Sequence, residues 1–211
     1  MIKAVIFDMD GVLIEAKDWH YESLNKALRL FGYEITRADH LTTFDGLPTK
    51  MKLEMLSREK GLPVDLHKFI NEMKQQYTIE MIHQLCKPLF IHEYAISSLK
   101  SSGYKLAVAS NSIRKTIDLM MEKSFLNKYM DILLSNEDVK NPKPDPEIYS
   151  TAISRFKLKP EECLILEDNE NGIRAARASK AHVLVVKDVN DVNLDNIMKK
   201  IKEIEKNEKA K

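Results

Sequence analysis

Five short apolar runs alternate along the chain with longer segments in which apolar residues recur at helical spacing. Each run consists of aliphatic and β-branched residues and ends at polar or turn-forming residues, a pattern typical of strands buried on both faces of a parallel sheet. Their alternation with helical segments predicts an α/β fold, a parallel sheet core with helices on both faces. The predicted strands are Ala4–Phe7, Leu106–Ala109, Ile132–Leu134, Leu164–Leu166 and Val183–Val186.

The segment between the first two predicted strands is far too long for a single crossover helix. Residues 14–85 have helical periodicity almost throughout, with stops at Gly32 and at Gly61. Because a structureless connection of this length is rare, we predict a small all-helical domain at 14–85, inserted into a core formed by 1–13 and 86–211. The alternative is that these helices form an ordinary layer of one larger domain.

Composition and charge exclude several classes of protein. Apolar residues make up 44% of the 211 residues, enough for a sizeable core, which argues against a disordered or fibrous chain. Lys and Arg total 33 against 32 Asp and Glu, and a net charge of +1 creates no general attraction to nucleic acid or to an anionic membrane. We therefore expect no nucleic-acid or membrane partner, and any anion site has to be built locally.

The chain has neither a membrane anchor pattern nor a cysteine framework. No apolar run approaches the roughly 20 residues of a membrane span, and the first residues lack a signal-peptide pattern. The two cysteines lie far apart and form no C-x-x-C pair, so neither a disulfide framework nor a zinc site is expected. These features predict a cytoplasmic protein.

The strongest local signal is a pair of carboxylates, Asp8 and Asp10, immediately after the first predicted strand. Ligands of open α/β sheets bind at the carboxyl ends of strands, where both side chains can point into one crevice. Two anions this close repel each other, so their ionised forms need a cation or hydrogen-bond donors nearby. Mg²⁺ meets this need with oxygen ligands, and Asp168, at another strand end, would complete the set. Glu167 beside it would adjust the charge or hold a metal-bound water. Taken alone, a pair of surface acids in a loop is the simpler interpretation.

Other strand ends carry groups that suit an anion. Ser110 and Asn111 follow the second predicted strand and are expected to begin a helix, whose N-terminus presents backbone N–H groups. Lys143 lies among three prolines, which restrict the loop, and its ammonium would bind a phosphate and neutralise the carboxylates. Lys140 could take this place, but the prolines favour Lys143. Together these residues predict a metal, an anion clamp and a nucleophile at one sheet edge.

With these residues in order, the chain resembles the haloacid dehalogenase superfamily, in the branch of β-phosphoglucomutase and phosphoglycolate-phosphatase-like enzymes. The similarity spans nearly the whole chain and implies a Rossmann-like catalytic core at 1–13 and 86–211 with a helical cap at 14–85. The four family motifs are Asp8-Met9-Asp10-Gly11-Val12, Ser110-Asn111, Lys143-Pro144 and Glu167-Asp168.

The resemblance implies a role for each motif. Asp8 would be the nucleophile that takes the phosphoryl group as an aspartyl-phosphate, and Asp10 would be the general acid and base. Such chemistry depends mainly on positioning and on neutralising the phosphoryl oxygens. The implied Mg²⁺ ligands are Asp8, the backbone carbonyl of Asp10, Asp168 and, in an assisting role, Glu167. The implied phosphate-binding residues are Ser110, Asn111 and Lys143.

The predicted cap decides between two reactions. Mutases of the β-phosphoglucomutase type carry a cap arginine that grips a second phosphate, but here Thr49 stands at that place. The neighbouring Lys50 is a point charge without the arginine fork. Ala16 also departs from the family, because many relatives have a threonine or serine there. These departures favour a Mg²⁺-dependent phosphatase acting on a small phosphorylated metabolite, a sugar or organic-acid phosphate, over a phosphosugar mutase.

Further predictions concern substrate contacts and the non-enzymatic alternative. His20 is explained equally well as a substrate contact and as a residue on a helix surface. For Lys74, a solvated surface lysine is a simpler interpretation than a substrate contact. A non-catalytic α/β binding module is disfavoured because the six glycines nowhere form G-x-G-x-x-G or a P-loop. We expect a monomer or weak homodimer. The candidate substrate residues of the cap are His20, Gly46, Thr49, Lys50 and Lys74.

Overall fold

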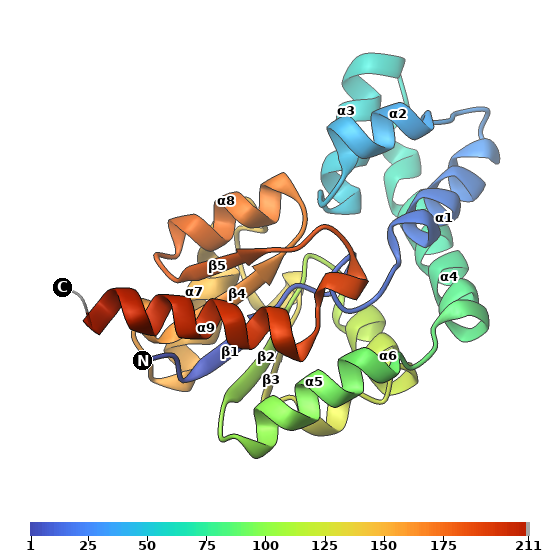
Figure 1. The fold of residues 1–211 in the computed structure, drawn as a ribbon. Coiled ribbons are helices and arrows are strands. Elements are labelled where there is room, and N and C mark those ends of the chain that lie inside the picture. The colour runs from blue at the N-terminus through green and yellow to red at the C-terminus, as the bar shows by residue number, and fades with distance from the viewer. Residues whose placement is uncertain (210–211) are drawn as a thin grey trace. The chain divides into compact units, whose positions relative to one another are not determined.

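The structure, a computed structural model, describes residues 1–209 and confirms the predicted α/β fold (Figure 1). Within these residues, five parallel strands form one sheet in the order β3-β2-β1-β4-β5. Residues 210 and 211, the end of the predicted core, lie outside the described part. The strands are β1 (Ala4–Phe7), β2 (Lys105–Ala109), β3 (Ile132–Leu134), β4 (Cys163–Glu167) and β5 (His182–Val185).

The observed strands differ from the predicted ones at a few ends. Glu167 is the last residue of β4 rather than the first residue after it, and β5 begins and ends one residue earlier than predicted. The reason is pairing between strands: Glu167 is in register with Val185, and its carbonyl accepts a hydrogen bond from Val186 N at 2.9 Å. A charged residue thus stays in the strand because its neighbour supplies the ladder bond.

The described chain divides into two compact units. The sheet unit comprises Met1–Glu15 and Lys87–Lys211, and the helical unit comprises Ala16–Cys86. The predicted insert at 14–85 differs from this division by a residue or two. The helical unit contains α1 (Lys17–Arg29), α2 (Arg37–Asp39), a π-helix (His40–Phe44), α3 (Thr49–Lys60), a 3₁₀ turn (Val64–Leu66) and α4 (His67–Leu85).

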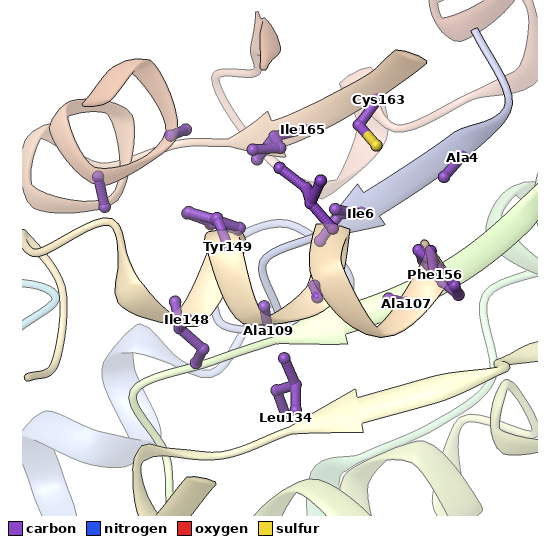
Figure 2. Close-up of a cluster of buried hydrophobic side chains, with 14 residues drawn as sticks. Ala4, Ile6, Ala107, Ala109, Leu134, Ile148, Tyr149, Phe156, Cys163 and Ile165 are labelled. Carbon is purple, nitrogen blue, oxygen red and sulfur yellow. The ribbon is translucent and has the colours of Figure 1, made fainter. Parts of the chain in front are cut away.

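Helices cover both faces of the sheet. On one face α7 (Glu147–Phe156) and α8 (Glu170–Ala178) pack against alternate residues of the central strands, among them Ile6, Ala107 and Ile165 (Figure 2). The opposite face is covered by helices that include α5 (Phe90–Ser101) and α9 (Leu194–Lys209), which contact each other. The remaining elements of this unit are α6 (Arg114–Lys123) and 3₁₀ turns at Asn127–Tyr129, Asn136–Asp138, Pro160–Glu162 and Val189–Asp191.

The helical unit has its own apolar core. Leu24 and Leu28, one turn apart on α1, are buried together with Leu56 and Ile70 from the following helices. The Asn25 side chain, buried beside them, donates to the carbonyl of Ile35 at 2.9 Å and accepts from its N–H at 3.0 Å. This pair of bonds ties α1 to the segment before α2.

Among the described residues, no helix is both long and apolar enough to cross a membrane.

One local prediction was wrong. Ser110 and Asn111 do not begin a helix, because α6 starts only at Arg114. The hydroxyl of Ser110 accepts a hydrogen bond from the backbone N–H of Ser112 at 3.0 Å. Such a local bond from side chain to backbone competes with helix formation and forms a turn here instead. Both residues therefore lie in the turn between β2 and α6.

Candidate active site

The candidate residues of the sheet unit meet at the carboxyl ends of three adjacent strands. The central strand β1 lies between β2 and β4, where the chain connections diverge, and such a point is the usual ligand crevice of open α/β sheets. The backbone of Asp8 continues the ladder, since its N–H donates to the carbonyl of Leu166 on β4 at 3.0 Å. Ser110 does the same beside β3, donating to Leu134 O at 3.0 Å. The sheet thus holds these backbones in place.

A tight turn follows Asp8. The carbonyl of Met9 accepts hydrogen bonds from the next residues along the chain, including Leu13 N and Ile14 N, both at 2.9 Å. Gly11 takes a φ of +88°, which a side chain would strain, and its N–H donates to Ile14 O at 2.7 Å. Gly11 therefore lets the chain turn back beside the carboxylates.

Lys143 occupies the centre of the site. Its Nζ donates to Asp8 Oδ1 at 2.6 Å, to Glu167 Oε1 at 2.7 Å and to the hydroxyl of Tyr149 at 2.7 Å. All four residues are buried, with Lys143 2%, Asp8 5% and Glu167 0% exposed. Buried charges are tolerated only when paired and hydrogen-bonded, and these contacts satisfy that condition. Lys143, which the prolines favoured, is thus the lysine beside Asp8.

The side chain of Asn111 connects two loops of the site. Its Oδ1 accepts from the backbone N–H of Lys143 at 3.0 Å, and its Nδ2 donates to the carbonyl of the same residue at 3.3 Å. The turn after β2 and the proline-rich loop are joined in this way. Asn111 therefore positions the backbone that carries the lysine.

Glu167 is fixed by hydrogen bonds at both carboxylate oxygens. Oε1 accepts from Lys143 and from the Tyr149 hydroxyl at 2.5 Å, while Oε2 accepts from the N–H of Asp168 at 3.1 Å and from the amide of Asn169 at 3.4 Å. The carboxylate also lies directly against Gly172 in α8. A Cβ at that position would stand 1.9 Å from Glu167 Oε1, so only glycine leaves room for the carboxylate.

Three carboxylates form a group that suits a divalent cation. Asp8, Glu167 and Asp168 each offer one oxygen, and these oxygens all lie within 4.8 Å of one another. An all-oxygen, anionic donor set is what hard cations such as Mg²⁺ prefer, so the residues fit the predicted metal. The carboxylate of Asp10 lies outside this group, and its Oδ2 accepts a hydrogen bond from Ser112 Oγ at 3.0 Å.

Burial and charge set the protonation of the site. Burial raises the pKa of the Asp8 carboxyl well above its usual value; the Lys143 ammonium opposes this shift, and the charges of Glu167, Asp168 and Asp10 add to it. Burial lowers the pKa of Lys143, but Asp8 and Glu167 outweigh it, so the pKa lies above its usual value. One ammonium thus faces several carboxylates, and a divalent cation would restore the balance of charge.

Two polar residues of the site were missed from the sequence. Tyr149 lies six residues after Lys143, and burial, with the charges of Glu167 and Asp8, raises its pKa well above the usual value, so that it remains a phenol. Its signal was a tyrosine at a core position of a helix, where the hydroxyl needs a partner. Ser112, the donor to Asp10, follows Ser110 by two residues and is one of several serines in the chain, so no pattern distinguished it.

The candidate substrate residues of the helical unit lie at its surface. The structure brings two of them together, since Lys74 Nζ lies 3.2 Å from His20 Nδ1. Both side chains are half-buried. The other three lie in or next to the segment that begins α3: Gly46 and Thr49 are partly exposed and Lys50 is exposed. Beside them Lys17 and Asp45 form an ion pair at 3.6 Å.

Comparison with protein families gives one match that covers most of the chain. The family model described as haloacid dehalogenase-like hydrolase matches residues 5–186. That span includes β1 from its second residue, β2 to β5, the helical unit and every candidate residue of both units.

Individual relatives and solved structures also match over most of the chain. A phosphorylated carbohydrates phosphatase from Thermotoga maritima is 30% identical over 179 residues, 83% of this chain and 81% of the relative. A β-phosphoglucomutase from Clostridium difficile superposes with a TM-score of 0.84 at 22% identity, covering 96% and 98% of the two chains, which is a likeness of fold. A variant of CbbY from Rhodobacter sphaeroides, in complex with xylulose-1,5-bisphosphate, gives a TM-score of 0.80 at 25% identity and covers 88% and 86%.

Proposed function

Because the chain belongs to the haloacid dehalogenase-like hydrolase family, we propose that it is a Mg²⁺-dependent phosphatase acting on a small phosphorylated metabolite through an aspartyl-phosphate. The observation that carries this proposal is the buried contact between Asp8 Oδ1 and Lys143 Nζ, beside the carboxylates of Glu167 and Asp168. A nucleophile, a fixed cation and a set of metal-binding oxygens stand together there, and phosphoryl transfer needs these groups.

In the proposed reaction Asp8 is the nucleophile. A carboxylate oxygen of Asp8 forms a bond to phosphorus while the bond from phosphorus to the leaving alcohol oxygen breaks, and Asp10 gives that oxygen a proton. A water then attacks the aspartyl-phosphate, Asp10 takes its proton, and inorganic phosphate leaves as Asp8 is regenerated. Ser112, which donates to Asp10 Oδ2, would orient this acid and base.

The negative charges of the phosphoryl group would be stabilised by three kinds of group: an ammonium, polar side chains and a metal ion. The ammonium of Lys143 and the polar groups of Ser110 and Asn111 would bind its oxygens. Bound Mg²⁺ would supply further charge neutralisation there, held by Asp8, Asp168 and the carbonyl of Asp10. Glu167 would assist from its bonded position. These groups stabilise charge as it moves between oxygens, the usual source of catalysis in phosphoryl transfer.

The helical unit would serve as the cap that recognises the rest of the substrate. His20, Gly46, Thr49, Lys50 and Lys74 are its proposed contact residues. The relative from Thermotoga maritima, a phosphatase of phosphorylated carbohydrates, supports a sugar phosphate, and Thr49 in place of the mutase arginine supports hydrolysis over transfer within a sugar. The cytoplasmic location and the monomer or weak homodimer stay predictions.

The test is release of inorganic phosphate from a panel of sugar phosphates, organic-acid phosphates, pyrophosphate and p-nitrophenyl phosphate, with Mg²⁺ or with EDTA. We expect release with Mg²⁺ only. The Asp8→Asn variant should lose at least about 1,000-fold in turnover, because the nucleophile is gone. Asp118→Asn, the same change at an exposed position of α6, should retain wild-type turnover.

Three results would contradict the proposal. These are release that persists in EDTA, release that survives in Asp8→Asn, and the absence of release from every compound. Should a hexose phosphate instead be isomerised without phosphate release, and only with a sugar bisphosphate present, the mutase alternative would replace the phosphatase.

A further inference from the structure

The hydroxyl of Tyr149 is a buried polar group that none of the four motifs accounts for. Tyr149 lies on the first turn of α7 and is fully buried. Its ring belongs to the apolar cluster between α7 and the sheet, beside Ile6 and Ile165 (Figure 2). A phenylalanine would fill that cluster as well, so packing alone gives no reason for a hydroxyl here.

The hydroxyl closes a triangle of hydrogen bonds. It accepts from Lys143 Nζ at 2.7 Å and donates to Glu167 Oε1 at 2.5 Å, while Lys143 Nζ and Glu167 Oε1 are themselves 2.7 Å apart. The same Nζ lies 4.6 Å from the centre of the Tyr149 ring. Three elements are tied at one point: the proline-rich loop, α7 and the end of β4.

The three N–H groups of the Lys143 ammonium all have acceptors, two of them within the triangle. An ammonium has three N–H groups, and Lys143 directs them at Tyr149 Oη, Glu167 Oε1 and Asp8 Oδ1. Two of the three bonds thus hold the ammonium in place, and the third reaches the carboxylate. With phenylalanine at 149, one N–H would lose its acceptor, and Glu167 would lose a donor.

We propose that Tyr149 is a positioning residue. Its hydroxyl holds Lys143 and Glu167 together by hydrogen bonds, so that the ammonium stays directed at Asp8. This inference rests on the proposed function, in which an Asp8 oxygen bonds to phosphorus and its contact with Lys143 changes. During that step the bonds to Tyr149 and Glu167 keep the ammonium beside the reacting atoms. Tyr149 itself touches neither substrate nor phosphoryl group.

The variant Tyr149→Phe removes the hydroxyl and keeps the ring. The matched control is Tyr129→Phe, because the Tyr129 hydroxyl also bonds a carboxylate, Glu93 Oε1 at 3.3 Å, and neither residue belongs to the four motifs. We expect Tyr149→Phe to lower kcat about 10- to 100-fold, the effect of one lost hydrogen bond to a charged group. KM should stay within about twofold, since no substrate contact is removed.

A second measurement reads the lysine directly. In protein labelled with ¹⁵N-lysine, the ammonium of Lys143 should give a signal protected from exchange with water, assigned by its loss in Lys143→Met. We expect that signal to persist in Tyr129→Phe and to broaden or vanish in Tyr149→Phe. A purely structural role for Tyr149 would lower the melting temperature and leave the signal of the folded fraction unchanged.

The outcomes separate this inference from the proposed function. A kcat for Tyr149→Phe within twofold of the Tyr129→Phe value, or an unchanged ammonium signal, overturns the positioning role while the phosphatase stands. Absence of turnover in the wild type overturns the proposed function, and the ammonium signal still tests the positioning. If Tyr149→Phe does not fold, the wild type decides: a Tyr149 hydroxyl proton that exchanges as fast as that of an exposed tyrosine overturns the inference.

Discussion

The two units hold their candidate residues in opposite ways. In the sheet unit Lys143 is buried and bonded to Asp8, Glu167 and Tyr149, so no member of that set can move alone. In the helical unit Lys74 is half-buried and lies beside His20. A charged site inside a protein therefore has to have all its charges paired and hydrogen-bonded, whereas surface residues can change without disturbing the fold. Chemistry common to a family suits the first arrangement, and substrate choice suits the second.

Buried polar residues differ between the units as well. Glu167 accepts hydrogen bonds at both oxygens, from four groups. His40 in the helical unit is 2% exposed, and within the described residues neither of its ring nitrogens has a hydrogen-bond partner. Burial, with the nearby charge of Lys52, lowers the pKa of His40 to about 4, so the ring is neutral at pH 7. The sheet unit stabilises charged groups in its interior, whereas in the helical unit the buried His40 ring stays uncharged.

The largest expected effect comes from removing the buried cation. Lys143→Met should lower the free energy of unfolding by about 3–5 kcal/mol, because Asp8 and Glu167 would be left buried without their partner. Turnover should be lost as well. Lys74→Met should change stability by less than about 0.5 kcal/mol and raise KM if Lys74 contacts substrate. Urea unfolding followed by circular dichroism measures the stability of both variants. Equal stability of the two variants would contradict the contrast drawn between the two units.

A pair of glycine variants gives the next effect. Gly172→Ala should cost about 3 kcal/mol and at least about tenfold in turnover, because its Cβ would displace the Glu167 carboxylate. Gly32→Ala in the helical unit meets no atom within 4 Å but has a φ of +76°, so we expect a loss of about 1 kcal/mol from backbone strain with turnover unchanged. Thermal melts and phosphate release test both. Wild-type turnover in folded Gly172→Ala would show that Glu167 is not needed in its place.

The smallest effect concerns acid. His40 binds a proton more weakly in the folded chain, where its pKa is about 4, than in the unfolded chain near 6.5, so stability falls as pH falls between these values. From pH 7 to pH 5 the loss should be about 2 kcal/mol. Trp19 on α1, the single tryptophan, reports unfolding of this unit by fluorescence.

The matched variants for this prediction are His40→Leu and His83→Leu. The first should remove most of the loss between pH 7 and pH 5. The second, at an exposed position of α4, should retain it. A His40→Leu protein with the wild-type pH dependence would exclude His40 as its source.

Much of the fold followed from the sequence. The apolar runs matched β1 and β3 at both ends. For β1 the reason is burial, because a strand buried on both faces leaves an uninterrupted apolar run. Glu167 at the end of β4 was placed outside its strand, because pairing with β5, and not local pattern, keeps it in the ladder. Ser110 was expected in a helix, and its hydroxyl forms a turn instead.

The candidate site divides in the same way. Asp8, Lys143 and Glu167 were found because each lies at a strand end or in a proline-rich loop, and parallel strands bring such ends to one edge. Tyr149 was missed although its hydroxyl bonds two of these residues, because an aromatic residue on a helix is typical of an apolar core position. Ser112, the donor to Asp10, had no distinguishing pattern.

Local sequence pattern was enough to predict the order of strands and helices along the chain, the position of the insert's helical pattern, and the residues that stand where strands end. It could do so because periodicity and turn residues encode burial and direction locally. Tertiary packing brings Tyr149 and Lys143 to hydrogen-bond distance of Glu167 and leaves no room for a side chain at position 172. Such contacts depend on distances of a few tenths of an ångström between α7, α8 and β4, and those distances are set by the packing of the whole unit rather than by any one segment.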